Sequence, residues 1–243
     1  MRPSTPKEGL AVAKKSDFKG RHFPAVTILV CLRWYLRYAL TYRDLVEIME
    51  ERGVTVAHTT IMRWVHKYAP LLNKRLRREL KKTGDSWKID ETYIRVKGQW
   101  KYLYRAVDKQ GNTLDFLLTA HRDQLAAMRF LKKALDAYHT VEPRVINTDQ
   151  APSFPPAIAA AKSVGALSVE VEHRQVKYLN NLVESDHRRI KRVIRHGLGF
   201  GSFRTAQQTI SGYEAMYMVR KGQATSRPGV YLDEVKVIEG LFA

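Results

Sequence analysis

Apolar residues recur every three or four positions over residues 25–68, which predicts three consecutive helices. The second of them begins at Thr41, whose hydroxyl can cap the amide of Asp44 while the Asp44 carboxylate reaches back. Gly53 is expected to end it, because glycine takes the left-handed C-terminal turn without steric cost. The third is expected over residues 59–68. Two short helices around a glycine-containing turn, behind a supporting helix, form a helix-turn-helix pattern.

From residue 87 onward the pattern becomes that of strands. Segments rich in Trp, Ile, Tyr and Val are separated by short turns, which predicts an antiparallel meander of three strands. Helical and strand-like segments then alternate. The expected strands are 87–96, 100–107, 113–119, 144–148 and 168–172, and the expected helices are 122–138, 155–164 and 181–196. The order β-β-β-α-β-α-β-α is that of the RNase H-like fold, so the expected fold class is α/β with an all-α N-terminal domain.

These patterns divide the chain into five parts. Pro70 is expected to end the third helix, and the strongly basic amphipathic segment 71–82 follows it. A last helix, over about 202–221, is expected to cap the core, with Tyr213 inward and Lys221 outward. The expected parts are a flexible basic arm (1–23), a helix-turn-helix DNA-binding domain (24–70), a basic linker helix and turn (71–86), an RNase H-like catalytic core (87–199) and a C-terminal helix and tail (200–243).

The charge balance points to a polyanionic partner. The 243 residues include 42 Lys and Arg against 24 Asp and Glu, a formal net charge of +18. A compact basic protein attracts nucleic acid and releases its counterions on binding. Composition alone leaves open a merely basic soluble surface or a ribosomal-type RNA-binding protein, although no aromatic and basic motif of an RNA-recognition module is present.

The cysteine content and the hydropathy restrict the class of protein further. Cys31 is the single cysteine, so there is no disulfide framework and no cysteine-based zinc site, which fits a reducing cytoplasm. No apolar run reaches the length of a membrane span, and the N-terminal region lacks the apolar segment of a signal peptide. We therefore expect a cytoplasmic, nucleoid-associated protein with no membrane partner and no small-molecule substrate.

The third helix is the expected DNA-reading element, because in a helix-turn-helix this helix lies in the major groove. Its apolar residues Ile61, Trp64 and Val65 are expected to face inward. The residues then expected to face DNA are Thr59, Thr60, Arg63 and Lys67. The alternative is an ordinary three-helix bundle with a basic face.

Three carboxylates stand where this order of elements would bring them together. Asp90 is in the middle of the first strand, Asp149 follows the fourth strand, and Glu184 is in the first turn of the helix 181–196. Oxygen ligands suit hard cations such as Mg²⁺, and two such ions can stabilise the attacking and leaving oxygens of a phosphoryl displacement. Each acid also has a purely structural alternative. Asp90 could be salt-bridged, Asp149 could start a turn, and Glu184 could cap its helix.

The helix that carries Glu184 has further basic residues at helical spacing. His187, Arg188, Lys191 and Arg195 share a face with Glu184, while Ile190, Val193 and Ile194 can point toward the core. We expect this face, and Arg188 and Lys191 in particular, to hold the DNA end. The alternative is a charge pattern that only solubilises the helix.

Several segments resemble the DDE transposases of bacterial and archaeal insertion sequences, most closely the IS-six family. They are Trp87-Lys88-Ile89-Asp90-Glu91-Thr92-Tyr93, Tyr102-Leu103-Tyr104-Arg105-Ala106-Val107-Asp108, Asn147-Thr148-Asp149, Val171 through Tyr178, Asn180-Asn181 through Glu184, Asp186-His187, Lys191-Arg192 and Arg220-Lys221-Gly222-Gln223. The separation of Asp149 from Glu184 matches the acid spacing of that family, and Lys191 holds its basic position two helical turns after the glutamate. Gln150 departs from the family, which is expected to have a basic residue there.

The resemblance implies a retroviral-integrase-type core in which Asp90, Asp149 and Glu184 are the catalytic and metal-binding residues. It also implies two Mg²⁺ ions per site, replaceable by Mn²⁺, with 3′-end cleavage, strand transfer and cointegrate formation as the reaction. The expected partners are double-stranded DNA, as short terminal inverted repeats and target, and further copies of the chain as a homodimer or higher oligomer. The alternatives are an RNase H-like nuclease or resolvase that cuts without joining, and a catalytically silent helix-turn-helix regulator derived from a transposase.

Overall fold

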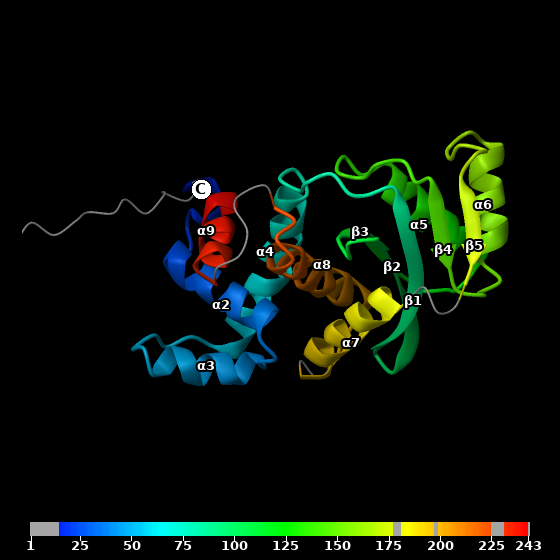
Figure 1. Cartoon of the computed structure of the whole chain (residues 1–243). Helices are drawn as coiled ribbons and strands as arrows, with labels where there is room; N and C mark the ends of the chain where they lie inside the picture. The colour runs from blue at the N-terminus through cyan, green and yellow to red at the C-terminus, as the bar shows by residue number, and fades with distance from the viewer. Residues whose placement is uncertain (1–14, 177–180, 197–198, 225–230, 243) are drawn as a thin grey trace, which may run out of the picture.

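Residues 86–175 contribute the strands of a five-stranded sheet (Figure 1). The computed structural model describes residues 15–176, 181–196, 199–224 and 231–242. The strand order is β3-β2-β1-β4-β5, in which β1, β2 and β3 are antiparallel and β4 and β5 run parallel to β1. The strands are β1 (Ser86–Val96), β2 (Gln99–Asp108), β3 (Thr113–Thr119), β4 (Val145–Thr148) and β5 (Glu172–Gln175). With the helices between them, this order is that of the RNase H-like fold, as predicted.

Local chemistry explains the meander. Lys97 and Gly98 connect β1 to β2, and both have positive φ angles of 47° and 77°. A two-residue turn of this hand matches the twist of the strands that it joins. The register then pairs Asp90 with Arg105 and Glu91 with Tyr104 across the two strands.

Helices cover both faces of the sheet (Figure 1). On one face, α5 (Gln124–Leu135) and α6 (Phe154–Ser163) pack in a cluster with Trp87, Ile89 and Tyr104. On the other face, α7 (Asn181–His196) and α8 (Phe203–Arg220) pack in a second cluster that includes Ile94 and Val96. Successive side chains of a strand point to opposite faces, so odd-numbered residues of β1 face α5 and α6 and even-numbered residues face α7.

The N-terminal helices are α1 (Lys15–Phe18), α2 (Ala25–Arg37), α3 (Tyr42–Glu50) and α4 (His58–Leu76). The predicted capping box is present, with 3.1 Å from the Asp44 amide to the Thr41 hydroxyl and 2.8 Å from the Thr41 amide to the Asp44 carboxylate. Gly53 has a φ of 72°, which agrees with the predicted left-handed turn. Residues 1–14 of the expected arm lie outside the described residues, whereas the ring of Phe18 stacks on Tyr68 of α4.

The expected end of the third helix at Pro70 is wrong, because α4 continues through it to Leu76. A proline removes one backbone donor and disfavours the helix locally. Tyr68, Ala69 and Leu72 are nevertheless fully buried around Pro70, so tertiary packing holds this turn in the helix. Residues 71–76 of the expected linker are therefore the last turns of α4.

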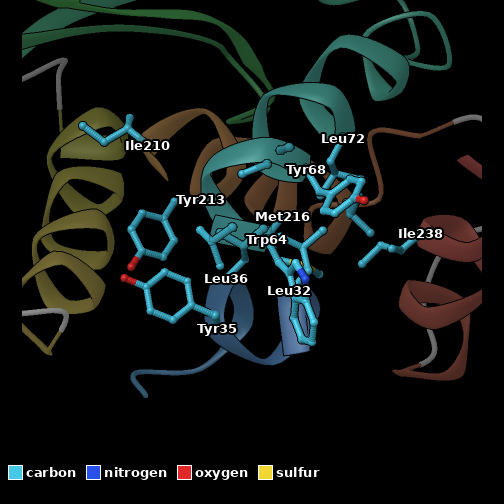
Figure 2. Packing of buried hydrophobic residues seen from close by; sticks show 14 of the residues in the cluster. Leu32, Tyr35, Leu36, Trp64, Tyr68, Leu72, Ile210, Tyr213, Met216 and Ile238 are labelled. Carbon is cyan, nitrogen blue, oxygen red and sulfur yellow. The ribbon is translucent and has the colours of Figure 1, made fainter. Parts of the chain in front are cut away.

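The C-terminal helices complete the core of the N-terminal helices, as Figure 2 shows for Leu36, Tyr213 and Met216. The expectation that residues 202–221 cap the catalytic core is thus wrong in its main contact, because α8 packs along α4 and α2 as well as on β3. Tyr213 faces inward as predicted, but Lys221 does not face outward and contacts Asp186 of α7. The last helix, α9 (Tyr231–Phe242), was not expected.

The fifth strand begins later than expected, at Glu172 rather than residue 168. Its apolar neighbours Leu167 and Val171 are buried in the cluster of α6, so the apolar run that predicted a strand covers this helix instead. The paired residues of β5 are polar and lie at the edge of the sheet. No helix in the described parts of the chain is both long and apolar enough to cross a membrane.

Candidate active site at the carboxylate cluster

The sheet register brings Asp90 and Asp149 together, as the sequence predicted. Ile89 of β1 is the partner of Thr148 of β4, so the residues that follow them, Asp90 and Asp149, lie at the same level where β4 ends beside β1. The Asp149 carboxylate also accepts the amide of Ala151 at 3.0 Å, which holds its loop in a turn after β4. The two carboxylates belong to one group whose ligand atoms lie within 4.8 Å of one another.

The third member of this group is Glu91, which the sequence analysis did not single out. Side chains alternate along β1, which places Glu91 on the face opposite to Asp90. The strand pattern therefore predicts that the two carboxylates lie apart. Glu91 is only 8% exposed and forms an ion pair with Arg122, at the start of α5. Two acidic residues in succession within an apolar strand were the only signal in the sequence.

Burial and the charges of neighbouring acids raise the pKa values of Asp90 and Glu91. The pKa of Asp90 is raised to about 7 by burial and by the neighbouring charges of Asp149 and Glu91. Burial also raises the pKa of Glu91, against the opposing charge of Arg122. A cluster of buried carboxylates with too little positive charge is stabilised by a bound cation, and oxygen ligands suit a divalent one. The residues present therefore fit a divalent metal ion.

Helix α7 lies across β1 beside this cluster (Figure 1). Nδ1 of His187 is 3.6 Å from Oδ2 of Asp90, and His187 is only 5% exposed. The pKa of His187 is lowered to about 3 by burial and by the charges of Arg105 and Lys191, so its ring is neutral. The expectation that His187 shares the exposed face of Glu184 is wrong, because His187 points to the sheet.

Glu184 is in the first turn of α7, as predicted, and it is exposed. It lies one turn before His187, the residue of α7 whose ring is 3.6 Å from the Asp90 carboxylate. Among the described residues the group within 4.8 Å comprises Asp90, Glu91 and Asp149, and Glu184 is not one of them.

Buried polar contacts fix α7 to the neighbouring elements. Asp186 accepts hydrogen bonds from Lys221 Nζ, at 2.7 Å, and from the hydroxyl of Tyr217, both in or next to α8. Arg105 of β2 lies 3.4 Å from the same carboxylate. Asp186 is 5% exposed, so these charges are held away from water. Asp186 and Lys221 lie in separate motifs of the sequence, and the contact between them was not expected.

The expected DNA-contact residues lie on two helices. On α7, Arg188 and Lys191 are exposed. On α4, Arg63 and Lys67 are exposed, and Thr59 and Thr60 are half-buried. Ile61, Trp64 and Val65 are buried beneath them, as predicted.

Comparison with known proteins identifies the family. A family model described as a DDE domain matches residues 84–223. The transposase for insertion sequence-like element IS431mec from Staphylococcus aureus (strain Mu50) is 44% identical over 206 residues, 84% of this chain and 88% of that protein. The transposase for insertion sequence element IS257 in transposon Tn4003, also from Staphylococcus aureus, has the same identity and coverage.

The structural matches are more distant. The catalytic core domain of HTLV-2 integrase in complex with magnesium, in its dimeric form, is 15% identical, with a TM-score of 0.45 over 59% of this chain and 97% of that chain. The core domain of BIV integrase is 16% identical, with a TM-score of 0.42 over 60% of this chain and 87% of that chain.

The matched domain and the carboxylates that it contains define an enzyme of the DDE class. The chain belongs to the IS-six family of insertion-sequence transposases, which the sequence resemblance had indicated.

Proposed function

We propose that this transposase binds the terminal inverted repeats of its insertion sequence and catalyses magnesium-dependent 3′-end cleavage and strand transfer into target DNA. The observation that carries the proposal is the meeting of Asp90 and Asp149 where β4 ends beside β1, next to the helix that bears Glu184. The expected site of action is the bacterial nucleoid in the cytoplasm, with two or more copies of the chain on the DNA.

Asp90, Asp149 and Glu184 are the proposed metal ligands, and Mn²⁺ is expected to replace Mg²⁺. When bound, two such ions supply electrophilic stabilisation of the attacking and leaving oxygens. In cleavage, a bond forms between water oxygen and phosphorus, and the bond from phosphorus to the 3′ oxygen breaks. In strand transfer, this freed 3′ hydroxyl forms a bond to a target phosphorus, and a 3′ oxygen of the target leaves.

The residues around the acids have supporting roles in this proposal. Arg122 offsets the charge of Glu91, which leaves Asp90 and Asp149 as the members of the cluster available to a metal ion. His187 is a neutral neighbour of Asp90 and limits its movement. Arg188 and Lys191 on the exposed face of α7 are proposed to hold the phosphates of the DNA end. Residues 24–70 are proposed to recognise the repeat, and residues 87–199 to carry out the chemistry.

Conservative variants of the acids test the proposal. The substrate is a duplex from the DNA that flanks the gene, chosen for a short imperfect inverted repeat at each end. With Mg²⁺, we expect the wild type to cleave and join it, and Asp90→Asn, Asp149→Asn and Glu184→Gln to bind it without doing either. We expect Glu91→Gln to keep measurable cleavage.

Each other outcome would indicate a different function or a different role for a residue. Cleavage without joined products would indicate a nuclease or resolvase, and binding without cleavage by the wild type would indicate a silent regulator. Loss of DNA binding by Asp90→Asn would make Asp90 a structural residue. Loss of activity in Glu91→Gln with normal activity in Glu184→Gln would replace Glu184 by Glu91 in the metal site.

A further inference from the structure

The sheet face that carries Glu91 is covered by helices over only part of its length. Trp87 and Ile89 of β1 are fully buried beneath α5 and α6. Glu91 is the next residue on this face, and beyond it Tyr93 is 43% exposed. The same change occurs on β2, where Tyr104 is fully buried but Trp100 is 59% exposed. The carboxylate cluster therefore lies where the covered part of the face meets the open part.

The open part carries two exposed aromatic rings and a half-buried third beside them, which we call the aromatic platform (Tyr93, Trp100 and Tyr102). Tyr93 and Tyr102 are cross-strand partners, and their ring centres are 5.3 Å apart. The ring centre of Trp100 is 6.3 Å from that of Tyr93. Aromatic cross-strand pairs stabilise a hairpin, but that role does not require most of the Trp100 ring to remain in water.

Positive charge accompanies the rings. The guanidinium of Arg95 lies over the Trp100 ring, 5.7 Å from its centre. Arg122 donates a hydrogen bond to the Tyr93 hydroxyl at 3.2 Å and forms the ion pair with Glu91. A single side chain thus connects the aromatic platform to the carboxylate cluster. Exposed rings interleaved with arginines are the usual means by which proteins bind unpaired nucleotides.

We propose that the aromatic platform stacks unpaired bases of a DNA strand whose phosphates pass the carboxylate cluster. The inference rests on the proposed function for the presence of DNA at this site, and it adds a contact to bases rather than to phosphates. Duplex DNA keeps its bases stacked on one another, so the aromatic platform favours DNA that is open next to the reacting phosphate. Single-stranded DNA is complementary to this surface, because its phosphates match the arginines and its bases match the ring faces. The net charge of +18 supports its approach.

The test uses the full chain without metal and a duplex of arbitrary sequence, either blunt or with a tail of about six unpaired thymidines. A third probe has abasic sites in place of those thymidines, so that it keeps the phosphates and lacks the bases. Affinities are measured by fluorescence anisotropy at one salt concentration. We expect the wild type to bind the thymidine tail more tightly than the abasic tail. An equal affinity for the two tails would overturn the proposal, because the attraction would then be electrostatic only.

Variants locate the contact. We expect Trp100→Ala to reduce the preference for the thymidine tail by about five- to one-hundred-fold, as is typical of loss of one stacked base, and to leave blunt-duplex binding unchanged. Trp100→Phe is expected to keep part of the preference. The matched control is Tyr138→Ala, which removes a tyrosine that is 77% exposed beyond the far end of α5 and should change nothing. An unchanged preference in Trp100→Ala and in Tyr93→Ala would also overturn the proposal.

These results are separable from the proposed function. A preference for the thymidine tail does not depend on recognition of the terminal repeat or on metal. Loss of repeat cleavage with a retained tail preference would count against the transposition chemistry alone. Normal cleavage and joining without any tail preference would count against the aromatic platform alone.

Discussion

Arg105 of β2 and Glu214 of α8 are 109 residues apart in the sequence and form a two-pronged ion pair, with nitrogen to oxygen distances of 2.7 and 2.9 Å. Both side chains are completely buried. The pair joins the sheet to the helix that packs against α2 and α4. Asp186 of α7 lies beside it, so three parts of the molecule meet at one group of buried charges.

The first prediction concerns this pair. Glu214→Ala leaves the Arg105 guanidinium buried without its main counter-charge, and such losses destabilise by about 3–5 kcal/mol. Urea denaturation followed by circular dichroism measures the change. Replacement of both residues by Met should recover part of the loss. The control is Glu172→Ala, whose partner Arg174 is on the surface, and it should change stability little. Equal effects of Glu214→Ala and Glu172→Ala would contradict the argument.

A second prediction concerns the contact of α8 with α4 and α2 at Gly212. A Cβ atom there would lie 2.5 Å from the Cβ of Ala69 and 2.8 Å from a methyl group of Leu36. Alanine is the better helix former, so any loss of stability in Gly212→Ala is steric. We expect a loss of about 1–3 kcal/mol in thermal or urea unfolding. Gly240→Ala in α9, where nothing lies within 4 Å, should instead be neutral or stabilising.

The pH dependence of stability reports on Asp90. Its pKa is about 7 in the folded protein, against an ordinary value of 3.8. Between these values the folded state holds a proton that the unfolded state has released. The contribution of Asp90 is therefore fully present below about pH 4 and is lost as the pH rises through 7. We expect metal-free Asp90→Asn to be more stable than the wild type at pH 8, by about 2–4 kcal/mol, and the difference to vanish near pH 4.

Denaturation in EDTA at several pH values measures this effect. The corresponding control is Mg²⁺, which should stabilise the wild type at pH 8 and should stabilise Asp90→Asn much less. If the wild type and Asp90→Asn lost stability in parallel from pH 4 to pH 8, the pKa shift would have to be assigned to another group.

Lys191 provides a test of the exposed face of α7. Lys191→Ala should fold normally, because the side chain is exposed, but should reduce joining of the terminal repeat. Rising salt should enlarge the defect, since one phosphate contact fewer competes with counterions. Lys132→Ala, an exposed lysine on α5 on the other side of the sheet, is the matched control. If Lys191→Ala joined DNA ends at the wild-type rate at moderate salt, the charges of this face would only solubilise the helix.

Arg63 tests the reading of sequence by α4. Arg63→Ala should weaken binding to the terminal repeat more than binding to random DNA, by about 1–3 kcal/mol if the guanidinium contacts a base edge. Gel-shift titrations with both duplexes over a range of salt measure the two affinities. Uniform weakening, with a shallower salt dependence, would assign Arg63 to a phosphate instead.

Local patterns predicted the elements that depend on local chemistry. The capping box at Thr41, the turn at Gly53 and the meander of β1 to β3 are each determined by a few adjacent residues. The meeting of Asp90 and Asp149 was also predictable, because parallel neighbours that start in register stay in register. These features required the order of the elements but no knowledge of side-chain packing.

The features that escaped prediction depend on contacts between distant segments. Pro70 remains inside α4 because α8, which follows all the strands of the sheet in the sequence, packs along that helix. Glu91 joins the acid cluster although strand alternation separates it from Asp90, and Arg122, which comes only after β3, forms its ion pair. Periodicity predicts which face of its own strand or helix a side chain lies on. It does not predict which side chains of the neighbouring element will contact it.

The close packing of Gly212 against Leu36 and Ala69 has a consequence for the order in which the protein can fold during synthesis. Domains usually fold as they leave the ribosome, the N-terminal one first. Here α2 and α4 share their core with α8, which is translated only after all the strands of the sheet. The N-terminal helical unit is therefore completed late, although it is the first part to be made. A chain that terminates early, after β5 for example, lacks α8, so the faces of α2 and α4 that α8 buries would stay open to water.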